Sequence, residues 1–270
     1  MKAGYLIVAP VLAALFCAGC QTAQKTVRLM SFNVRMGCGH DDPFVLPKGS
    51  VGHLPQCADV IRREAPDVVG IQEIDRGTER AGGLDQTAEL ARLSGMEGTF
   101  VKKVDQPGGD YGLGMLSKVR PLSVGKVLMK GSLHTRALMI CEFSDYYVAN
   151  THFPLADWAC TNAAAVVRTN LRDLAKRKPV FLMGDFNSLP DSETMRSIKE
   201  EFVVLSDETR FTWSAKKPDR TIDFVLVDKA HADSVRVLHR EVISAPEATD
   251  HAALVVDVKV ETLVVKKQSK

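Results

Sequence analysis

Short apolar runs rich in valine, isoleucine and phenylalanine recur along the chain and predict β-strands. They occupy residues 27–34, 67–72, 112–117, 137–143, 146–151, 180–184, 221–227 and 252–260. Apolar residues recur at helical spacing in residues 54–64, 84–93, 157–177 and 191–202. Strands outnumber helices, and several follow one another with no helix between them. This order favours an α/β fold that is a four-layer α/β/β/α sandwich, two mixed sheets flanked by helices, over a strictly alternating fold.

Residues 26–262 are predicted to form one domain, because no composition break or low-complexity tract long enough to be a linker interrupts the pattern. Before this domain, one basic residue precedes an almost wholly apolar stretch over 5–16, which is too short for a comfortable membrane span. That form is typical of a secretory signal, which we assign to residues 1–19. Residues 20–25 are then predicted to be a short tether, and residues 263–270 a basic tail.

The end of the predicted signal has a further feature. Ala18, Gly19 and Cys20 resemble the end of a bacterial lipoprotein signal, in which the cysteine is lipidated and becomes the first residue of the mature chain. Cys17 stands where that pattern usually has an aliphatic residue, so an ordinary cleaved signal is the alternative. Lipidation at Cys20 implies an exported protein anchored to a membrane of the bacterial cell envelope.

Charge and cysteine content limit the classes of function. The formal net charge of the 270 residues is +2, which argues against bulk binding to nucleic acid but leaves a locally basic groove open. Two lysine pairs, Lys102–Lys103 and Lys216–Lys217 with the nearby Trp213, could contact a polyanion, but a solvated face is the expected interpretation of such scattered lysines. The cysteines lack the paired spacing of a zinc site, and isolated thiols and a disulfide between Cys38 and Cys57 both stay open.

Carboxylates, amides and imidazoles gather at the ends of the predicted strands. They are Asn33, Glu73, His152, Asp185, Asn187, Asp250 and His251. A rigid sheet would hold such side chains in place while the adjoining loops leave room for a substrate. Each one alone has a structural explanation, as a turn cap, a solvated charge or a satisfied histidine, but together they predict a functional site.

Seven short motifs carry a resemblance to a known family. In chain order they are SFNVR (31–35), GIQEI (70–74), YGLGMLSK (111–118), NTHF (150–153), GDFNSLP (184–190), TIDFVLV (221–227) and TDHAAL (249–254). Together they resemble the endonuclease/exonuclease/phosphatase superfamily, whose members include deoxyribonucleases, sphingomyelinases and inositol-polyphosphate phosphatases. The resemblance implies metal-dependent hydrolysis of a phosphoester.

The resemblance also implies a role for each polar residue. Glu73 and Asp250, with Asn33 nearby or through a water, would bind Mg²⁺, for which Mn²⁺ is a plausible substitute. Asp185 would activate or position the attacking water, and Asn187 would hold a phosphate oxygen as part of the catalytic and substrate-binding set.

The remaining roles concern the phosphate. His251 would contact it, with Asp223 orienting the imidazole, and His152 and Tyr111 would donate to it or stabilise the transition state. Arg136 could bind the phosphate as a fork donor, and a surface ion pair is an equal alternative for it. Asp185 and His251 both stay candidates for the general base.

Three hypotheses about function follow. The first is an exported hydrolase acting on a phosphorylated small molecule or a lipid headgroup, as a monomer held at the membrane by its lipid anchor. The second is a nuclease of the same fold, which the small net charge disfavours. The third is a binding module without catalysis, which is disfavoured because no motif position lacks its polar residue. Monoester and diester substrates both stay open.

Overall fold

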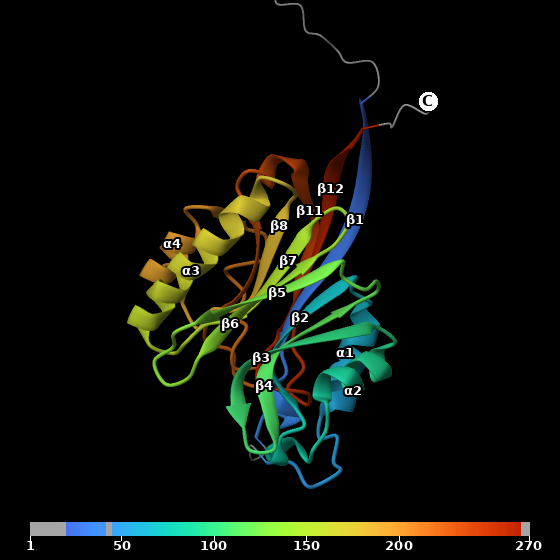
Figure 1. Cartoon of the computed structure of the whole chain (residues 1–270), viewed down its shortest axis with the longest axis vertical. Coiled ribbons are helices and arrows are strands. Elements are labelled where there is room, and N and C mark those ends of the chain that lie inside the picture. Colours follow the sequence, from blue (N-terminus) through green and yellow to red (C-terminus); the bar gives the residue numbers. More distant parts are fainter. Residues whose placement is uncertain (1–19, 42–44, 266–270) are drawn as a thin grey trace, which may run out of the picture.

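Two six-stranded mixed sheets lie face to face at the centre of the computed structural model, which describes residues 20–41 and 45–265 (Figure 1). The first sheet has the order β11 (Val235–Ile243), β12 (Ala253–Val265), β1 (Cys20–Asn33), β2 (Val68–Arg76), β4 (Gly109–Ser117), β3 (Glu97–Gln106). The second has the order β5 (Ser123–Met129), β6 (Arg136–Glu142), β7 (Tyr147–His152), β8 (Val180–Asp185), β10 (Asp223–Asp228), β9 (Phe202–Val204).

Helices cover the outer face of each sheet. In Figure 1, α1 (Leu54–Glu64) and α2 (Gln86–Ser94) lie on the flank of the first sheet, and α3 (Asp157–Ala175) and α4 (Glu193–Ile198) lie on that of the second. Short 3₁₀ turns occur at Arg35–Gly37, Glu79–Ala81 and Ala232–Ser234. The predicted four-layer sandwich of two mixed sheets flanked by helices is therefore confirmed.

Both sheets are built on the same plan. Each contains one parallel pair joined by a helix, β1 with β2 through α1 and β7 with β8 through α3, while the other neighbouring strands are antiparallel. Because β12 runs antiparallel to β1, and β10 antiparallel to β8, these strands start at the edge where the parallel pairs end. The ends of β1, β2, β7 and β8 and the starts of β10 and β12 therefore lie together at one edge of the sandwich, the edge where the strands end or begin.

The alternation of apolar residues along the strands builds three buried layers. In β1, Val27 and Leu29 face the layer between the sheets, whereas Met30 and Phe32 face the layer under α1. In the same way β8 sends alternate residues into the layer between the sheets and the layer under α3. A strand buried on both faces reads as a continuous apolar run, which is why these runs are visible in the sequence.

A polar network crosses the apolar layer between the two sheets. The side-chain amide of Asn150 in β7 donates to the carbonyl oxygens of Ile71 and Gly114, both at 2.9 Å. Its oxygen accepts from Nε2 of Gln72 at 2.7 Å. All of these groups are buried, so the network ties the middle of β2 and of β4 to β7 in the other sheet.

All the predicted strands and helices are present, and four further strands were not predicted. These four, β3, β5, β9 and β11, are the edge strands of the two sheets. The boundaries of β1 and β12 also differ from the prediction. Residues 20–25, expected to be a tether, pair with β12 from Cys20 opposite Val265 to Lys25 opposite Val260, so this segment and 263–265 belong to strands. Backbone pairing in this two-stranded extension needs no apolar pattern, so the polar sequence did not reveal it.

The structure bears differently on the predicted terminal segments, on the possible disulfide and on membrane-spanning helices. The predicted signal at 1–19 lies outside them, as does the end of the predicted basic tail at 266–270. Cys38, Cys57, Cys141 and Cys160 are buried free thiols, so no Cys38–Cys57 disulfide is present. Within 20–41 and 45–265, no helix combines the length and apolar character needed to cross a bilayer.

Candidate active site

The polar residues predicted from the sequence converge where the strand ends meet. Asn33 ends β1, His152 ends β7, Asp185 ends β8 and Asp223 begins β10. His152 and Asp223 are the register partners of Asp185 on its two sides, so the three side chains lie abreast on the face that looks toward the other sheet. Glu73 lies in β2, and Asp250 and His251 lie just before β12.

Asp185 is the centre of this cluster. Its Oδ2 atom accepts from Nδ2 of Asn33 at 3.2 Å and lies 3.6 Å from Nε2 of His152 and 3.8 Å from Nε2 of His251. Its Oδ1 atom accepts from the backbone N–H of Asn187 at 2.9 Å. The carboxylate of Asp185, a residue that is only 2% exposed, thus faces two imidazoles and an amide.

Burial and neighbouring charges shift the proton affinities of these groups. Burial, and then the negative charge of Asp223, raise the pKa of Asp185 to about 7. Burial alone would lower the pKa of His251, but the charge and hydrogen bond of Asp223 raise it to about 10. Burial and the positive charge of Lys103 hold the pKa of His152 well below its usual range. The two histidines around Asp185 therefore have opposite protonation preferences at neutral pH.

His251 and Asp223 form the predicted pair. Nδ1 of His251 lies 3.0 Å from Oδ2 of Asp223. Because Nδ1 faces this carboxylate, Nε2 is the nitrogen that faces Asp185. Thr212 supports the pair from behind, since its hydroxyl accepts from the backbone N–H of Asp223 at 3.2 Å.

Two further carboxylates flank Asn33. Its Nδ2 atom also donates to Oε1 of Glu73 at 3.2 Å. On the other side, the hydroxyl of Thr249 donates to the carbonyl oxygen of Asn33 at 3.0 Å, which places the adjoining Asp250 nearby. The side chains of Glu73 and Asp250 are each 21% exposed, so both carboxylates can reach an ion bound in the cavity. Carboxylate and amide oxygens suit a hard divalent cation.

Two of the predicted site residues have left-handed backbone conformations. Glu73 has φ of 54° and lies within the irregularity between Ile71 and Ile74 in the pairing of β2 with β4, and Asn187 has φ of 45°. Such values are uncommon outside glycine and cost of order 1 kcal/mol each. The surrounding structure thus holds both side chains in directions that a regular strand would not give them.

A cavity of about 720 Å³ opens over the cluster. Tyr111 and Arg136 line it, as predicted for substrate contacts, while Asn33 and Asp223 lie behind the lining residues. Its other lining residues include Glu73, His152, Asp185, Asn187, Asp250 and His251. The structure therefore brings together every site residue predicted for the domain, and their individual roles stay predictions.

The sequence did not reveal several residues of the cavity wall. Arg80 lies with its guanidinium carbon 4.7 Å from the centroid of the Tyr111 ring and is held by the buried carboxylate of Asp75. The guanidinium carbon of Arg220 lies 4.5 Å from the centroid of the Trp213 ring, and both residues line the cavity, although Trp213 was already a candidate contact for a polyanion. These residues come from loops with no strand to mark them, although Arg80 follows the GIQEI motif closely enough to have been considered.

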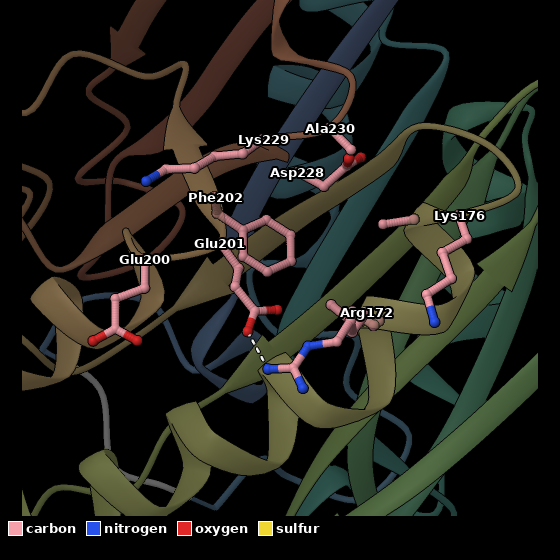
Figure 2. A pocket seen from close by; sticks show the side chains of 10 residues that line it. Arg172, Lys176, Glu200, Glu201, Phe202, Asp228, Lys229 and Ala230 are labelled. Atoms are coloured by element: carbon pink, nitrogen blue, oxygen red, sulfur yellow. Dashed lines mark hydrogen bonds and ion pairs between the residues drawn. The ribbon is translucent and has the colours of Figure 1, made fainter.

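A second cavity, of about 430 Å³, lies between α3 and the ends of β9 and β10 (Figure 2). Its lining residues include Leu171, Phe202 and the ion pair of Arg172 with Glu201, which is drawn as a dashed line in Figure 2. It shares no residue with the first cavity. Because its charged groups hold no cluster of imidazoles or unpaired carboxylates, the candidate active site is the first cavity.

Comparisons with solved structures find proteins of the same fold. An endonuclease/exonuclease/phosphatase from Bacteroides vulgatus is similar at 18% identity and a TM-score of 0.70, over 87% of this chain and 99% of that chain. A mannosyl-6-phosphatase from Bacteroides thetaiotaomicron is similar at 16% identity and a TM-score of 0.66, over 86% of this chain and 99% of its own. The human Nocturnin catalytic domain with bound sulfate is similar at 16% identity and a TM-score of 0.62, over 91% of this chain and 98% of that domain's chain.

These structures share the fold, and the family itself is identified from the sequence. The model of the endonuclease/exonuclease/phosphatase family matches residues 30–251, which run from β1 to His251 and include every residue of the cluster around Asp185. The chain therefore belongs to the endonuclease/exonuclease/phosphatase family.

Proposed function

We propose that the protein is a Mg²⁺-dependent hydrolase that cleaves the phosphate ester of a small molecule. The observation that carries this proposal is the buried carboxylate of Asp185, which faces His152, His251 and Asn33 in one cavity. Phosphoester hydrolysis needs a proton acceptor for water beside donors for the phosphate oxygens, and this cluster offers both.

Glu73, Asp250 and Asn33 are the residues that would hold Mg²⁺. When bound, the ion would neutralise phosphate oxygens and lower the pKa of a water. Asp185, Asp223 and His251 also place one ligand atom each within 4.8 Å of one another, so they are an alternative ligand set. The first set is favoured, because Nδ1 of His251 is engaged with Asp223 and the pKa of about 10 keeps its imidazole protonated.

The chain's own residues can then be given roles in the reaction. Asp185 would accept the proton of the attacking water, and the backbone N–H of Asn187 would keep its carboxylate oriented. The protonated Nε2 of His251 would donate to the phosphate oxygens or to the leaving group. Tyr111 and Arg136, both on the cavity wall, would bind the remaining phosphate oxygens.

The size and charge of the site support a small substrate. A cavity of about 720 Å³ lies within the usual range for small-molecule sites. A duplex nuclease needs many phosphate contacts outside the catalytic centre, and the net charge of +2 offers few. One structurally similar protein is a mannosyl-6-phosphatase, which supports sugar phosphates as the first substrates to test.

The predicted lipid anchor disfavours a headgroup in the anchoring membrane. Cys20 and Asn33 stand at opposite ends of a strand of 14 residues. At about 3.3 Å per residue, a lipid on Cys20 would lie roughly 40 Å from the catalytic centre. We propose an exported, membrane-anchored, monomeric protein whose site faces a soluble substrate. Labelling with radioactive palmitate in a bacterial host would test the anchor, because Cys20→Ser should abolish the label.

A substrate panel tests the proposed activity. Purified protein with Mg²⁺ or Mn²⁺ should hydrolyse at least one of p-nitrophenyl phosphate, bis-p-nitrophenyl phosphate, sugar phosphates, inositol phosphates or sphingomyelin. Glu73→Gln should abolish turnover, whereas Glu89→Gln, which breaks a surface pair with Arg92, should leave it unchanged. Hydrolysis of no phosphoester would refute the proposal. Plasmid cleavage that falls steeply with salt would show the nuclease alternative to be right.

A further inference from the structure

One lysine of β3 faces the interior. Val101 and Lys103 are both buried and stand two residues apart, so they share the inner face of the strand. Lys103 lies at a bulge, because Lys102 is opposite Gly112 and Val104 is opposite Tyr111. Lys102 stays at the surface, with Nζ 2.9 Å from Oδ1 of Asp110, as expected for a solvated face. Lys103 is only 4% exposed, which contradicts the expectation that it belongs to that face.

The ammonium group of Lys103 has no hydrogen-bond partner among the described residues. Its Nζ atom lies 3.8 Å from the centroid of the Tyr111 ring, and Tyr111 lines the catalytic cavity. Contact with a ring face attracts the cation but does not replace the hydrogen bonds that a lysine loses on burial. The position is therefore costly for the fold, and a bound anion would offset that cost.

The charges around Lys103 place it within electrostatic reach of the active site. Burial and the positive charge of Arg136 lower the pKa of Lys103 to about 7, while the negative charges of Glu73 and Asp185 oppose this shift. Arg136 and Arg80 both line the cavity, and Arg80 also lies against the Tyr111 ring. Arg80 and Lys103 therefore lie against the Tyr111 ring, and Arg136 is close enough to act electrostatically on both Tyr111 and Lys103.

We propose that Lys103 is a positioning residue of the active site, which holds the Tyr111 ring from behind and adds positive charge for the substrate's phosphate. The inference rests on the proposed function, because the substrate's phosphate is the negative counter-charge for the Lys103 ammonium group. A residue kept for this purpose should weaken the fold and strengthen anion binding at the same time.

Three variants separate this role from a structural one. Lys103→Met removes the charge at nearly constant length, Lys103→Arg keeps the charge, and Lys102→Met removes a neighbouring surface ion pair as the control. For each variant we would measure kcat and KM for p-nitrophenyl phosphate with Mg²⁺, the inhibition constants of inorganic phosphate and sulfate, and the Tm. Sulfate is included because its charge stays constant across the neutral and alkaline range.

The expected result is a loss of anion affinity without a loss of stability. At pH 6, below the Lys103 pKa of about 7, Lys103→Met should bind phosphate and sulfate about tenfold more weakly, because one unit charge is removed from a poorly solvated region. Its KM should rise more than its kcat falls, and its Tm should be equal to or above that of the wild type. Lys103→Arg should restore most of the anion affinity, and Lys102→Met should bind both anions as the wild type does.

Two results would overturn the inference in different ways. Suppose that the wild type hydrolyses p-nitrophenyl phosphate. If Lys103→Met then binds both anions as tightly as the wild type, or if Lys103→Met and Lys103→Arg both have a lower Tm than the wild type, Lys103 is only structural and the proposed function stands. If the wild type neither hydrolyses a phosphoester nor binds phosphate, the proposed function fails and this inference fails with it.

Discussion

Substitution of Asn150 tests directly whether the hydrogen-bond network between the two sheets stabilises the fold and positions the site. The substitution Asn150→Leu keeps a similar volume and removes three hydrogen bonds, to the carbonyl oxygens of Ile71 and Gly114 and from the amide of Gln72. These groups are buried between two sheets, where water cannot replace the lost partner.

The size of the effect follows from the groups left unpaired. The carbonyl oxygens of Ile71 and Gly114 lose a donor, whereas Nε2 of Gln72 keeps its bonds to Gly70 and Ser31. Each buried polar group that loses its partner costs about 1–3 kcal/mol, so the substitution should lower the free energy of unfolding by about 3 kcal/mol. For a chain of this size each kcal/mol corresponds to about 2–4 °C, so the Tm should fall by about 6–12 °C. Because Glu73 follows Ile71 and Gln72 directly, kcat/KM should also fall about tenfold or more at a temperature where the variant is folded.

Calorimetry and steady-state kinetics on purified protein check both expectations. The matched control is Asn170→Leu, because Asn170 also donates to a backbone carbonyl, that of Val166 at 2.8 Å, but on the exposed face of α3. The control should change the Tm by no more than about 1 °C, as exposed substitutions usually do. If Asn150→Leu lowers the Tm no more than Asn170→Leu does, the network does not hold the sheets together as argued.

Three further predictions concern the charge pair of His251, packing at Gly70 and the dependence on a metal. Because the pKa of His251 is raised to about 10 from an unfolded value of about 6.5, its pairing with Asp223 stabilises the fold fully below pH about 6.5 and loses this effect as the pH rises through 10. Asp223→Asn should therefore lower the free energy of unfolding more at pH 6 than at pH 10 in urea titrations, and an equal loss at both would contradict the assignment. Gly70→Ala should lower the Tm by several degrees in calorimetry, because the added methyl would lie 2.7 Å from Sδ of Met183, whereas Gly83→Ala, with open space around it, tests the strain of positive φ alone. Chelation with EDTA should abolish turnover in the substrate assay, and Mg²⁺ should restore it; activity that survives EDTA would exclude a metal-dependent reaction.

The sequence allowed the central strands to be predicted but not the edges of the sheets. Strands buried on both faces, such as β8, read as continuous apolar runs. The four strands that were not predicted all lie at sheet edges, where one side of the ladder and much of each face are exposed. In β5, for example, the first four residues are all exposed, so no apolar alternation marks the strand.

The same distinction applies to the site. Asp185, His152 and Asp223 could be predicted because they stand at the ends of buried strands and belong to recognisable motifs. Lys103 was not predicted, because it lies in the edge strand β3, where no clear apolar alternation shows which residues face inward. The left-handed conformation of Glu73 is likewise imposed by tertiary contacts, since glutamate has no intrinsic preference for it.

The most direct test of the central claim is the turnover of Asp185→Asn. This variant keeps the shape of the side chain, removes the proposed proton acceptor and leaves the cavity in place. With Mg²⁺ and the best substrate of the panel, kcat should fall by about 10³-fold or more while the Tm stays within a few degrees of the wild type or rises, because a buried carboxylate is removed. A kcat within tenfold of the wild type, from protein that is folded by calorimetry, would contradict the placing of catalysis at Asp185.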